Sequence, residues 1–334
     1  MKTKAIVFTA SEKAELIDVE LPPIQAGEIL LWSTVSGVSV GTERWALMGR
    51  RPEMKFPFIT GYLGVGVVEQ AGDGASGFQV GDRVFTTAAR HQEPYRSNSW
   101  LGTHCERLIV PTACGLEWPP YVCKIPDAVD DASAAMAGLA AVSIQGADML
   151  KVTARDTALV LGLGMIGQSS VQVLRAKGAR VIGADISQMR VDAARRAGCD
   201  GVVRLSADTP IKNQLTDLVP ATGADIVVDT TAAPSVLLQL ADLVKVRGQI
   251  LFQGYYPGTT ALNLDALHGR RPTIHVACAF DLESHRQAHR LIGSGGMKLG
   301  PLITHQPSVK DVSKIYEMLL HNSDEFLGIV FHWN

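Results

Sequence analysis

The segment "ALVLGLGMIGQSSVQVLRAKGARVIGADIS", residues 158–187, decides the fold of this chain. A run of apolar residues leads into the pattern Gly162-x-Gly164-x-x-Gly167, a helical stretch follows, and a second apolar run ends at Asp185. This order predicts a strand, a tight turn, a helix and a second, parallel strand. A glycine pattern alone is a weak signal, but in this context it is the complete fingerprint of a dinucleotide-binding α/β fold.

The three glycines have different expected roles. Gly162 permits the tight turn, Gly164 lets the backbone approach a pyrophosphate, and Gly167 lets the helix pack closely on the strand. Met165 and Ile166 complete this loop. The pyrophosphate is expected at the N-terminus of the helix, where free N–H groups and the helix dipole favour an anion.

Asp185 indicates which dinucleotide is bound. A carboxylate at this position accepts a hydrogen bond from a ribose 2′-hydroxyl and repels a 2′-phosphate, so NAD(H) is predicted rather than NADP(H). Arg190 is near enough in the sequence to reach such a phosphate, which keeps NADP(H) open. Two other interpretations are an ordinary strand–helix turn and an FAD site, although FAD fingerprints usually lie near the N-terminus.

Strands and helices continue to alternate after residue 127. The Ala-rich residues 127–150 predict a helix, and residues 187–198 predict another that begins with a Ser187 cap and ends at Gly198. Further strands are expected at 223–231, 248–254 and 273–280. Continuous apolar strands between helices indicate a parallel sheet that is covered on both faces.

The first 120 residues differ, because short alternating strands are broken by Gly and Pro. This pattern predicts a small β unit, such as a distorted barrel. The expected strands are residues 5–9, 28–37, 63–72, 82–87 and 106–111.

Composition excludes several classes of protein. The chain is 46% hydrophobic and 19% charged with a net charge of −2, so no basic face for nucleic acid is expected. No apolar run is long enough to span a bilayer, and the first residues lack a signal-peptide core. The expected location is therefore cytoplasmic, with a small-molecule substrate and no membrane or nucleic-acid partner.

Cysteine and histidine spacing predicts no metal site. The count of five cysteines is odd and no secretory signal is recognised, so reduced thiols are expected. Cysteines 105, 114 and 123 are too far apart for a zinc knuckle. Histidines 268, 275, 285 and 289 show no metal-binding pattern and are interpreted as surface or structural residues.

The whole chain resembles the medium-chain dehydrogenase/reductase superfamily. The matching segments are "GDRVF" (81–85), "GTHCERLIVP" (102–111), "AAMAGLAAVSIQG" (134–146), "LVLGLGMIG" (159–167) and "GPLITH" (300–305). The resemblance implies an α/β protein with a Rossmann-type parallel-sheet cofactor domain, residues 126–280. It also implies a β-rich, GroES-like catalytic domain formed by residues 1–125 and 281–334.

The positions that bind zinc in this superfamily have changed. The family cysteine is replaced by Ser39, and the family His-Glu pair is replaced by Tyr62-Leu63. No cysteine lies between residues 81 and 104, where the cluster that binds a second, structural zinc is expected. The chain is similar to a zinc-free subgroup typified by bacteriochlorophyllide a dehydrogenase, which oxidises a hydroxyethyl side chain of a chlorin. That subgroup has Glu where this chain has Leu63.

Without zinc, side chains must handle the proton that accompanies hydride transfer. By the resemblance Thr42 matches the hydroxyl of a proton relay, Glu43 is a candidate base, and Tyr62 points at the reacting oxygen. Arg44 is a candidate for the cation that lowers the pKa of Tyr62, or for an ion-pair partner of Glu43. Structural alternatives are a helix cap for Thr42 and simple core packing for Tyr62.

The resemblance also places residues around the substrate. Trp100 and Leu101 line the pocket in the family, and His104 lies beside it, as a proton relay or as a hydrogen-bonded structural residue. Gly254 allows close approach of the nicotinamide, and Tyr255 would shape the pocket.

The leading hypothesis is a zinc-independent, NAD(H)-dependent oxidoreductase that interconverts a secondary alcohol and a ketone, with a ring-bearing substrate as one option. The alternatives are a quinone or enone reductase and a non-catalytic NAD-binding protein. A homodimer is expected through residues 273–280, because an unpaired apolar edge strand is a liability in a monomer.

Overall fold

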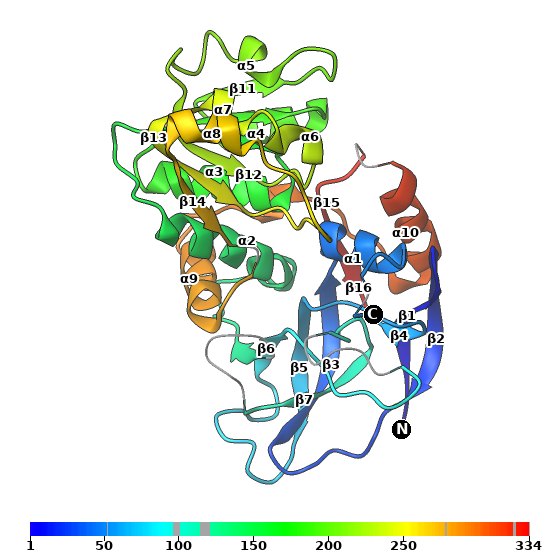
Figure 1. Cartoon of the computed structure of the whole chain (residues 1–334). Coiled ribbons are helices and arrows are strands. Elements are labelled where there is room, and N and C mark those ends of the chain that lie inside the picture. The colour runs from blue at the N-terminus through cyan, green and yellow to red at the C-terminus, as the bar shows by residue number, and fades with distance from the viewer. Residues whose placement is uncertain (52, 96–100, 114–120, 278, 323–324, 334) are drawn as a thin grey trace. The chain divides into compact units, whose positions relative to one another are not determined.

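A computed structural model describes residues 1–51, 53–95, 101–113, 121–277, 279–322 and 325–333. Contacts between Cα atoms divide the chain into two compact units (Figure 1). The first unit contains Met1–Gly138, Asp281–Ser294 and Leu299–Asn334, and the second contains Leu139–Phe280 and Gly295–Lys298. The sequence predicts domain borders after residues 125 and 280. The first unit instead continues to Gly138, and Asp131 is held within it by the side chains of Thr34 and Arg83.

The first unit is built on two sheets. The smaller has the order β2-β1-β4, and the larger has the order β15-β16-β3-β5-β6-β8, with β7 paired to β3. The strands are β1 (Lys2–Ala10), β2 (Lys13–Glu20), β3 (Glu28–Gly37), β4 (Phe58–Ile59), β5 (Gly64–Ala71), β6 (Arg83–Thr86), β7 (Arg107–Pro111), β8 (Val122–Lys124), β15 (Ile303–His305) and β16 (Gly328–His332). The five strands predicted for this region are confirmed.

Helices from distant parts of the sequence complete the first unit. They are α1 (Val40–Leu47), α9 (Leu282–Gly293), α10 (Val312–His321) and two 3₁₀ turns, η1 (Gly300–Leu302) and η2 (Val309–Asp311). Leu47 of α1, Leu319 of α10 and Phe331 of β16 are all 0% exposed and belong to one apolar cluster. This cluster fixes α1 against the C-terminal segment.

The second unit is the predicted parallel sheet. Its order is β11-β10-β9-β12-β13-β14, and every neighbouring pair is parallel. The strands are β9 (Thr157–Leu161), β10 (Arg180–Asp185), β11 (Gly201–Arg204), β12 (Ala224–Asp229), β13 (Val244–Phe252) and β14 (Thr273–Val276). All residues of β9 are buried, as expected for a central strand with both faces covered.

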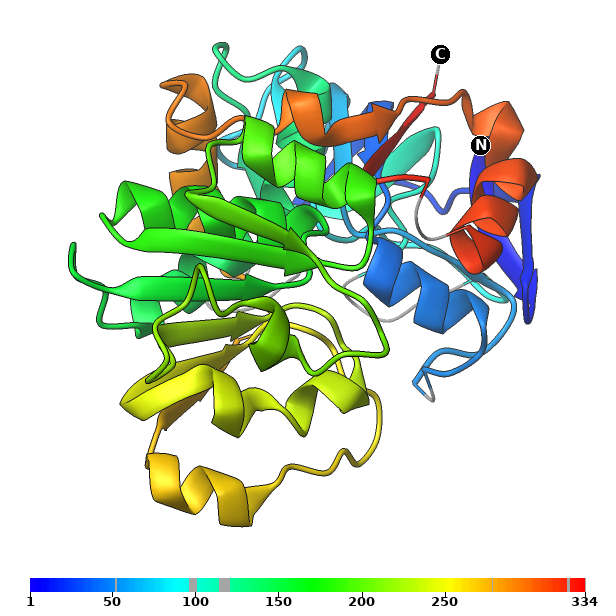
Figure 2. The same ribbon diagram turned by 90° about the horizontal axis from the view of Figure 1, so that it is seen from above.

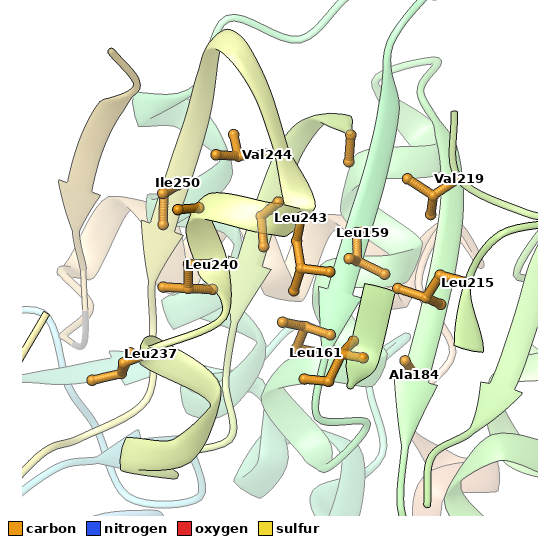
Figure 3. Close-up of a cluster of buried hydrophobic side chains, with 14 of the residues drawn as sticks. Leu159, Leu161, Ala184, Leu215, Val219, Leu237, Leu240, Leu243, Val244 and Ile250 are labelled. Atoms are coloured by element: carbon orange, nitrogen blue, oxygen red, sulfur yellow. The ribbon is translucent and has the colours of Figure 1, made fainter. Parts of the chain in front are cut away.

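Helices cover the two faces of this sheet, as Figure 2 shows from above. They are α2 (Asp131–Met149), α3 (Met165–Ala176), α4 (Gln188–Arg196), α5 (Ile211–Gln214), α6 (Pro234–Leu237), α7 (Leu240–Leu243) and α8 (Leu264–Arg270). Leu159 and Leu161 point from β9 into a cluster with Leu240 and Leu243 of α7 (Figure 3). Alternate residues of β9 face α3 on the other side, because side chains alternate along a strand.

The glycine-rich turn between β9 and α3 follows from two local constraints. Gly162 has φ +82°, which a side chain rarely adopts. A Cβ atom on Gly167 would lie 1.9 Å from the carbonyl oxygen of Gly162. The close approach of helix to strand that the sequence predicts is therefore present.

One predicted detail is wrong. Ser187 occupies the N-cap position of α4, but its side chain makes no capping hydrogen bond. The backbone N–H of Ser187 instead donates to Asp185 Oδ1 at 2.8 Å. Gly198, with φ +86°, lies just beyond the end of α4 as expected. None of the described helices is long and apolar enough to cross a membrane.

Gly167→Ala is expected to lower the free energy of unfolding by at least about 1–3 kcal/mol, because backbone must move to admit the methyl group. Gly164→Ala is the matched control, since nothing lies within 4 Å of an added Cβ there. It is expected to cost less than about 1 kcal/mol, the scale of a poorer N-cap. Urea unfolding measures both, and equal losses would contradict the packing argument.

The predicted homodimer is tested at β14, which pairs only with β13 among the described strands. Ile274 and Val276 are 41% and 67% exposed on this edge strand. We expect Ile274→Lys with Val276→Lys to turn a dimer into a monomer, because lysine blocks edge-to-edge pairing. Light scattering measures the mass, and Val80→Lys, an exposed apolar site of the first unit (66%), is the control. A wild-type monomer, or a double variant that stays dimeric, would refute the prediction.

Candidate functional site

The buried carboxylate of Glu43 lies at the centre of the candidate site in the first unit. The side chain is 1% exposed and projects from α1. Its Oε1 atom accepts from the backbone N–H of Ser39 at 2.8 Å, and Oε2 lies 3.1 Å from Nε2 of His104. Oε2 also accepts a short hydrogen bond from the hydroxyl of Tyr316. Three donors therefore surround this carboxylate, which a buried charge requires.

His104 is held by a second set of hydrogen bonds. Its Nδ1 atom lies 2.7 Å from Ser36 Oγ, and Trp333 Nε1 donates to the same oxygen at 2.9 Å. Since the Glu43 carboxylate only accepts, Nε2–H of His104 donates to it, and Nδ1 of the neutral ring then accepts from the Ser36 hydroxyl, which accepts from the indole N–H. The ring is 0% exposed and packs against Gly61, where an added Cβ would lie 2.6 Å from the ring carbons.

Tyr62 joins this network through Ser39. Its hydroxyl donates to Ser39 Oγ at 2.6 Å and is also hydrogen-bonded to Thr42. Burial raises the pKa of Tyr62 above its usual value, and the negative charge of Glu43 adds to the rise. The hydrogen bonds to Ser39 and Thr42, and the charge of Arg51, only partly oppose this. Tyr62 therefore remains protonated at neutral pH.

Three sequence-based expectations about these residues are wrong. The cation that acts on Tyr62 is Arg51, not Arg44, and it does not bring the pKa below the usual value. Arg44 makes no ion pair with Glu43, because its guanidinium donates to the carbonyl of Leu320 at 3.2 Å. Thr42 does not cap α1, which begins at Val40 after an N-cap at Ser39.

The predicted pocket residues are less directly defined. Leu101 and His104 are buried in the first unit, at 1% and 0% exposure. Tyr255 is partly buried and follows β13 in the second unit. Trp100 lies outside the described residues. The assignment of these residues to a substrate pocket remains a prediction.

The glycine-rich loop and Asp185 meet in the second unit. Asp185 Oδ2 accepts from the backbone N–H of Leu163 at 2.6 Å, and Arg190 Nη1 lies 3.9 Å from the same oxygen. The Asp185 carboxylate is thereby aligned beside the loop, at the carboxyl end of β10. Gly164 is the N-cap of α3, and its surroundings leave space for a phosphate to approach the backbone.

The other predicted cofactor residues lie beside this loop or just after the end of β13. Met165 is buried in the first turn of α3, and the carbonyl of Ile166 accepts from Ser143 Oγ at 2.8 Å. A Cβ on Gly254 would lie 2.7 Å from the backbone nitrogen of Ala232, so the backbone is closely approached there.

Sequence reasoning missed several residues of the Glu43 network, namely Ser36, Tyr316 and Trp333. Ser36 lies three residues before Ser39, but its role depends on His104, which is remote in the sequence. Tyr316 and Trp333 come from the C-terminal segment, and no local pattern indicates that they return to α1.

Two family models match the chain. Residues 25–120 match the alcohol dehydrogenase GroES-like domain, and residues 165–294 match a model described as zinc-binding dehydrogenase. Two relatives match along nearly their whole length. An alcohol dehydrogenase of Cupriavidus necator is 24% identical, covering 98% of this chain and 97% of that one. The 2-desacetyl-2-hydroxyethyl bacteriochlorophyllide A dehydrogenase of Cereibacter sphaeroides is 25% identical, covering 100% and 99%.

Solved structures agree in fold. An alcohol dehydrogenase from Escherichia coli, complexed with NADH, superposes with a TM-score of 0.84 at 21% identity, covering 99% of each chain. Acetophenone reductase from Geotrichum candidum, in complex with NAD, has a TM-score of 0.82 at 22% identity, covering 99% of this chain and 97% of that one. The order of the two matched domains along one chain, and the three sheets observed, establish that this protein belongs to the medium-chain dehydrogenase/reductase superfamily.

Proposed function

We propose that the protein is an NAD(H)-dependent oxidoreductase that interconverts a secondary alcohol and a ketone without a catalytic zinc ion. The observation that carries the proposal is the Tyr62 hydroxyl, which is held 2.6 Å from Ser39 Oγ beside the buried Glu43. The resemblance to zinc-binding members of the family matches Ser39 and Tyr62 to metal-ligand positions, which supports a proton donor in place of the metal.

Ligand chemistry supports a zinc-free site. Ser39 and Tyr62 stand where zinc members have Cys and His, and a hydroxyl and a protonated phenol are poor zinc ligands. Leu63, at the position of the family glutamate, offers no donor atom and is 0% exposed. The carboxylate that is present, Glu43, already accepts hydrogen bonds from the protein itself.

The second unit fits a nicotinamide dinucleotide. The backbone at Gly164 and the first turn of α3 would hold the pyrophosphate, and Asp185 would accept from the adenosine ribose hydroxyls. When bound, the nicotinamide supplies or accepts hydride. Two relatives in fold are complexed with NADH or NAD, which supports this class of cofactor.

Side chains of the first unit would provide the proton. In the direction of ketone reduction, the Tyr62 O–H turns from Ser39 Oγ to the substrate oxygen and transfers its proton to the developing alkoxide. The Ser39 and Thr42 hydroxyls, which contact Tyr62, would then relay a proton from solvent to the phenolate, each donating one proton as it accepts another. Glu43 holds Ser39 in place through the backbone, and His104 and Tyr316 hold Glu43.

The substrate class is a ketone or secondary alcohol on a ring-bearing molecule. The full-length similarity to a bacteriochlorophyllide dehydrogenase supports a hydroxyethyl or acetyl group beside a ring. Leu63 adds an apolar residue at a position where that subgroup has an acid, so a less polar substrate than a bacteriochlorophyllide fits equally with this site.

Chelator-treated protein is expected to oxidise NADH with an aryl methyl ketone such as acetophenone, and added Zn²⁺ should not raise the rate. Tyr62→Phe should lower kcat by about 10²–10⁴-fold, the usual contribution of a general acid, while NADH binding is unchanged.

The pH dependence of the wild type tests the raised pKa of Tyr62. We expect kcat/KM to stay constant through neutrality and to fall only when the pH exceeds the pKa of an ordinary tyrosine side chain. Stopped-flow NADH absorbance measures these rates.

Tyr95→Phe is the control, since Tyr95 is a partly buried tyrosine of the same unit outside the Glu43 network. Full activity in Tyr62→Phe would exclude Tyr62 as the acid. Turnover restricted to enones or quinones would assign the chain to the enone reductases, and NADH binding without turnover would favour a non-catalytic protein.

Asp185→Asn should raise the ratio of NADPH to NADH kcat/KM by at least about tenfold, equivalent to about 1.4 kcal/mol. The substitution removes the charge that repels a 2′-phosphate and leaves Arg190 without its nearby carboxylate, which lies 3.9 Å away. Initial rates with each cofactor measure the ratio. Asp192→Asn on α4 is the control, because Asp192 pairs with Arg195 on the surface. An unchanged ratio in Asp185→Asn would show that another group selects the cofactor.

A further inference from the structure

A buried cluster of cysteine and histidine lies in the first unit, apart from the residues of the Glu43 network. Sγ of Cys123 and one ring nitrogen each of His285 and His289 all lie within 4.8 Å of one another. The three residues are 6%, 0% and 2% exposed. Cys123 belongs to β8, whereas His285 and His289 are four residues apart on α9, which is orange in Figure 1.

The interpretation of these two histidines as surface or merely structural residues is therefore incomplete, because both are buried and face one cysteine. Residues at i and i+4 share a face of a helix, so α9 presents both rings toward the same strand. Their Nε2 atoms are 3.2 Å apart. Two imidazoles bound to one tetrahedral Zn²⁺ would have nitrogens about 3.3 Å apart, given Zn–N distances of about 2.0–2.1 Å.

Aromatic rings pack against the cluster. The centroid of the His285 ring lies 4.1 Å from that of Phe85 and 5.7 Å from that of Tyr121. Burial lowers the pKa of His289 to about 4, and the charge of nearby Arg83 adds to this effect. Arg83 itself is paired with Asp131. The two rings are joined by a hydrogen bond between their Nε2 atoms, which a bound ion would replace with two metal–nitrogen bonds.

We propose that Cys123, His285 and His289 form a binding site for one transition-metal ion, best suited to Zn²⁺, that links β8 to α9. Thiolate sulfur together with imidazole nitrogen is a ligand set that zinc prefers, and a water molecule would complete the tetrahedron. The site shares no residue with Ser39, Tyr62 or Glu43. A metal here stabilises the first unit and takes no part in hydride or proton transfer.

Binding has a defined proton balance. The Cys123 thiol loses its proton to solvent as the Zn–S bond forms. The proton on the Nε2 atom that donates the His285–His289 hydrogen bond moves to Nδ1 of the same ring, so the imidazoles release none. One proton is therefore released for each ion bound. Because all three ligands are buried, the ion enters while the chain folds or opens locally, and it is retained afterwards.

The test uses tag-free, full-length protein produced in medium supplemented with Zn²⁺ or with Co²⁺ as a spectroscopic probe. Metal content is measured by mass spectrometry, and the Co²⁺ form by absorbance. We expect one ion per chain, a thiolate-to-cobalt charge-transfer band, and the intense visible bands of tetrahedral Co²⁺. The thermal midpoint should be higher with metal than without, because ligands that bind the folded state stabilise it.

Cys123→Ala and His289→Gln should each lose the ion, the charge-transfer band and the metal-dependent shift in midpoint. Cys199→Ala is the matched control: this thiol belongs to the second unit, donates to the carbonyl of Val181, and should leave all three readouts intact. If one of these two variants fails to fold, the other still tests whether the three residues bind the ion. Metal-free wild type, equal metal in both variants, or bound Co²⁺ without the charge-transfer band would each overturn the proposal.

Discussion

The buried carboxylate of Glu43 is the constraint on which the candidate site depends. A charge that is 1% exposed must be satisfied by donors, and these come from Ser39 at the start of α1, from His104, and from Tyr316 on α10. Segments that are remote in the sequence are thereby held around the Glu43 carboxylate. Loss of any one donor would leave the charge under-satisfied, so the site and the folding of the first unit are coupled.

Under the proposed function, the same network would allow carbonyl chemistry without a catalytic metal. Zinc would polarise a substrate oxygen as a Lewis acid. In our proposal a tyrosine with a raised pKa offers a proton in its place, and a serine held by Glu43 orients that tyrosine. The rigid support of Ser39 matters because a general acid acts only within hydrogen-bond reach of its target.

Sequence patterns predicted the features that depend on neighbouring residues. The glycine fingerprint, the parallel strands and the strands of the first unit follow from local periodicity and turn chemistry, and they are confirmed. Features that depend on tertiary packing were not predictable. Tyr316 reaches Glu43 only because α10 packs on α1, Arg51 rather than Arg44 acts on Tyr62, and Cys123 meets His285 only because α9 lies against β8.

Transfer of deuterium from 4-deuterated NADH tests the central claim most directly. Chelator-treated protein is incubated with the deuterated cofactor and either acetophenone or a conjugated enone, and the product is examined by mass spectrometry and NMR. The account predicts deuterium on the carbinol carbon of the alcohol, with transfer slowed by about 10²–10⁴-fold when Tyr62 is replaced by Phe. Deuterium on the β-carbon of a saturated ketone, or transfer to acetophenone that requires added Zn²⁺, would contradict it.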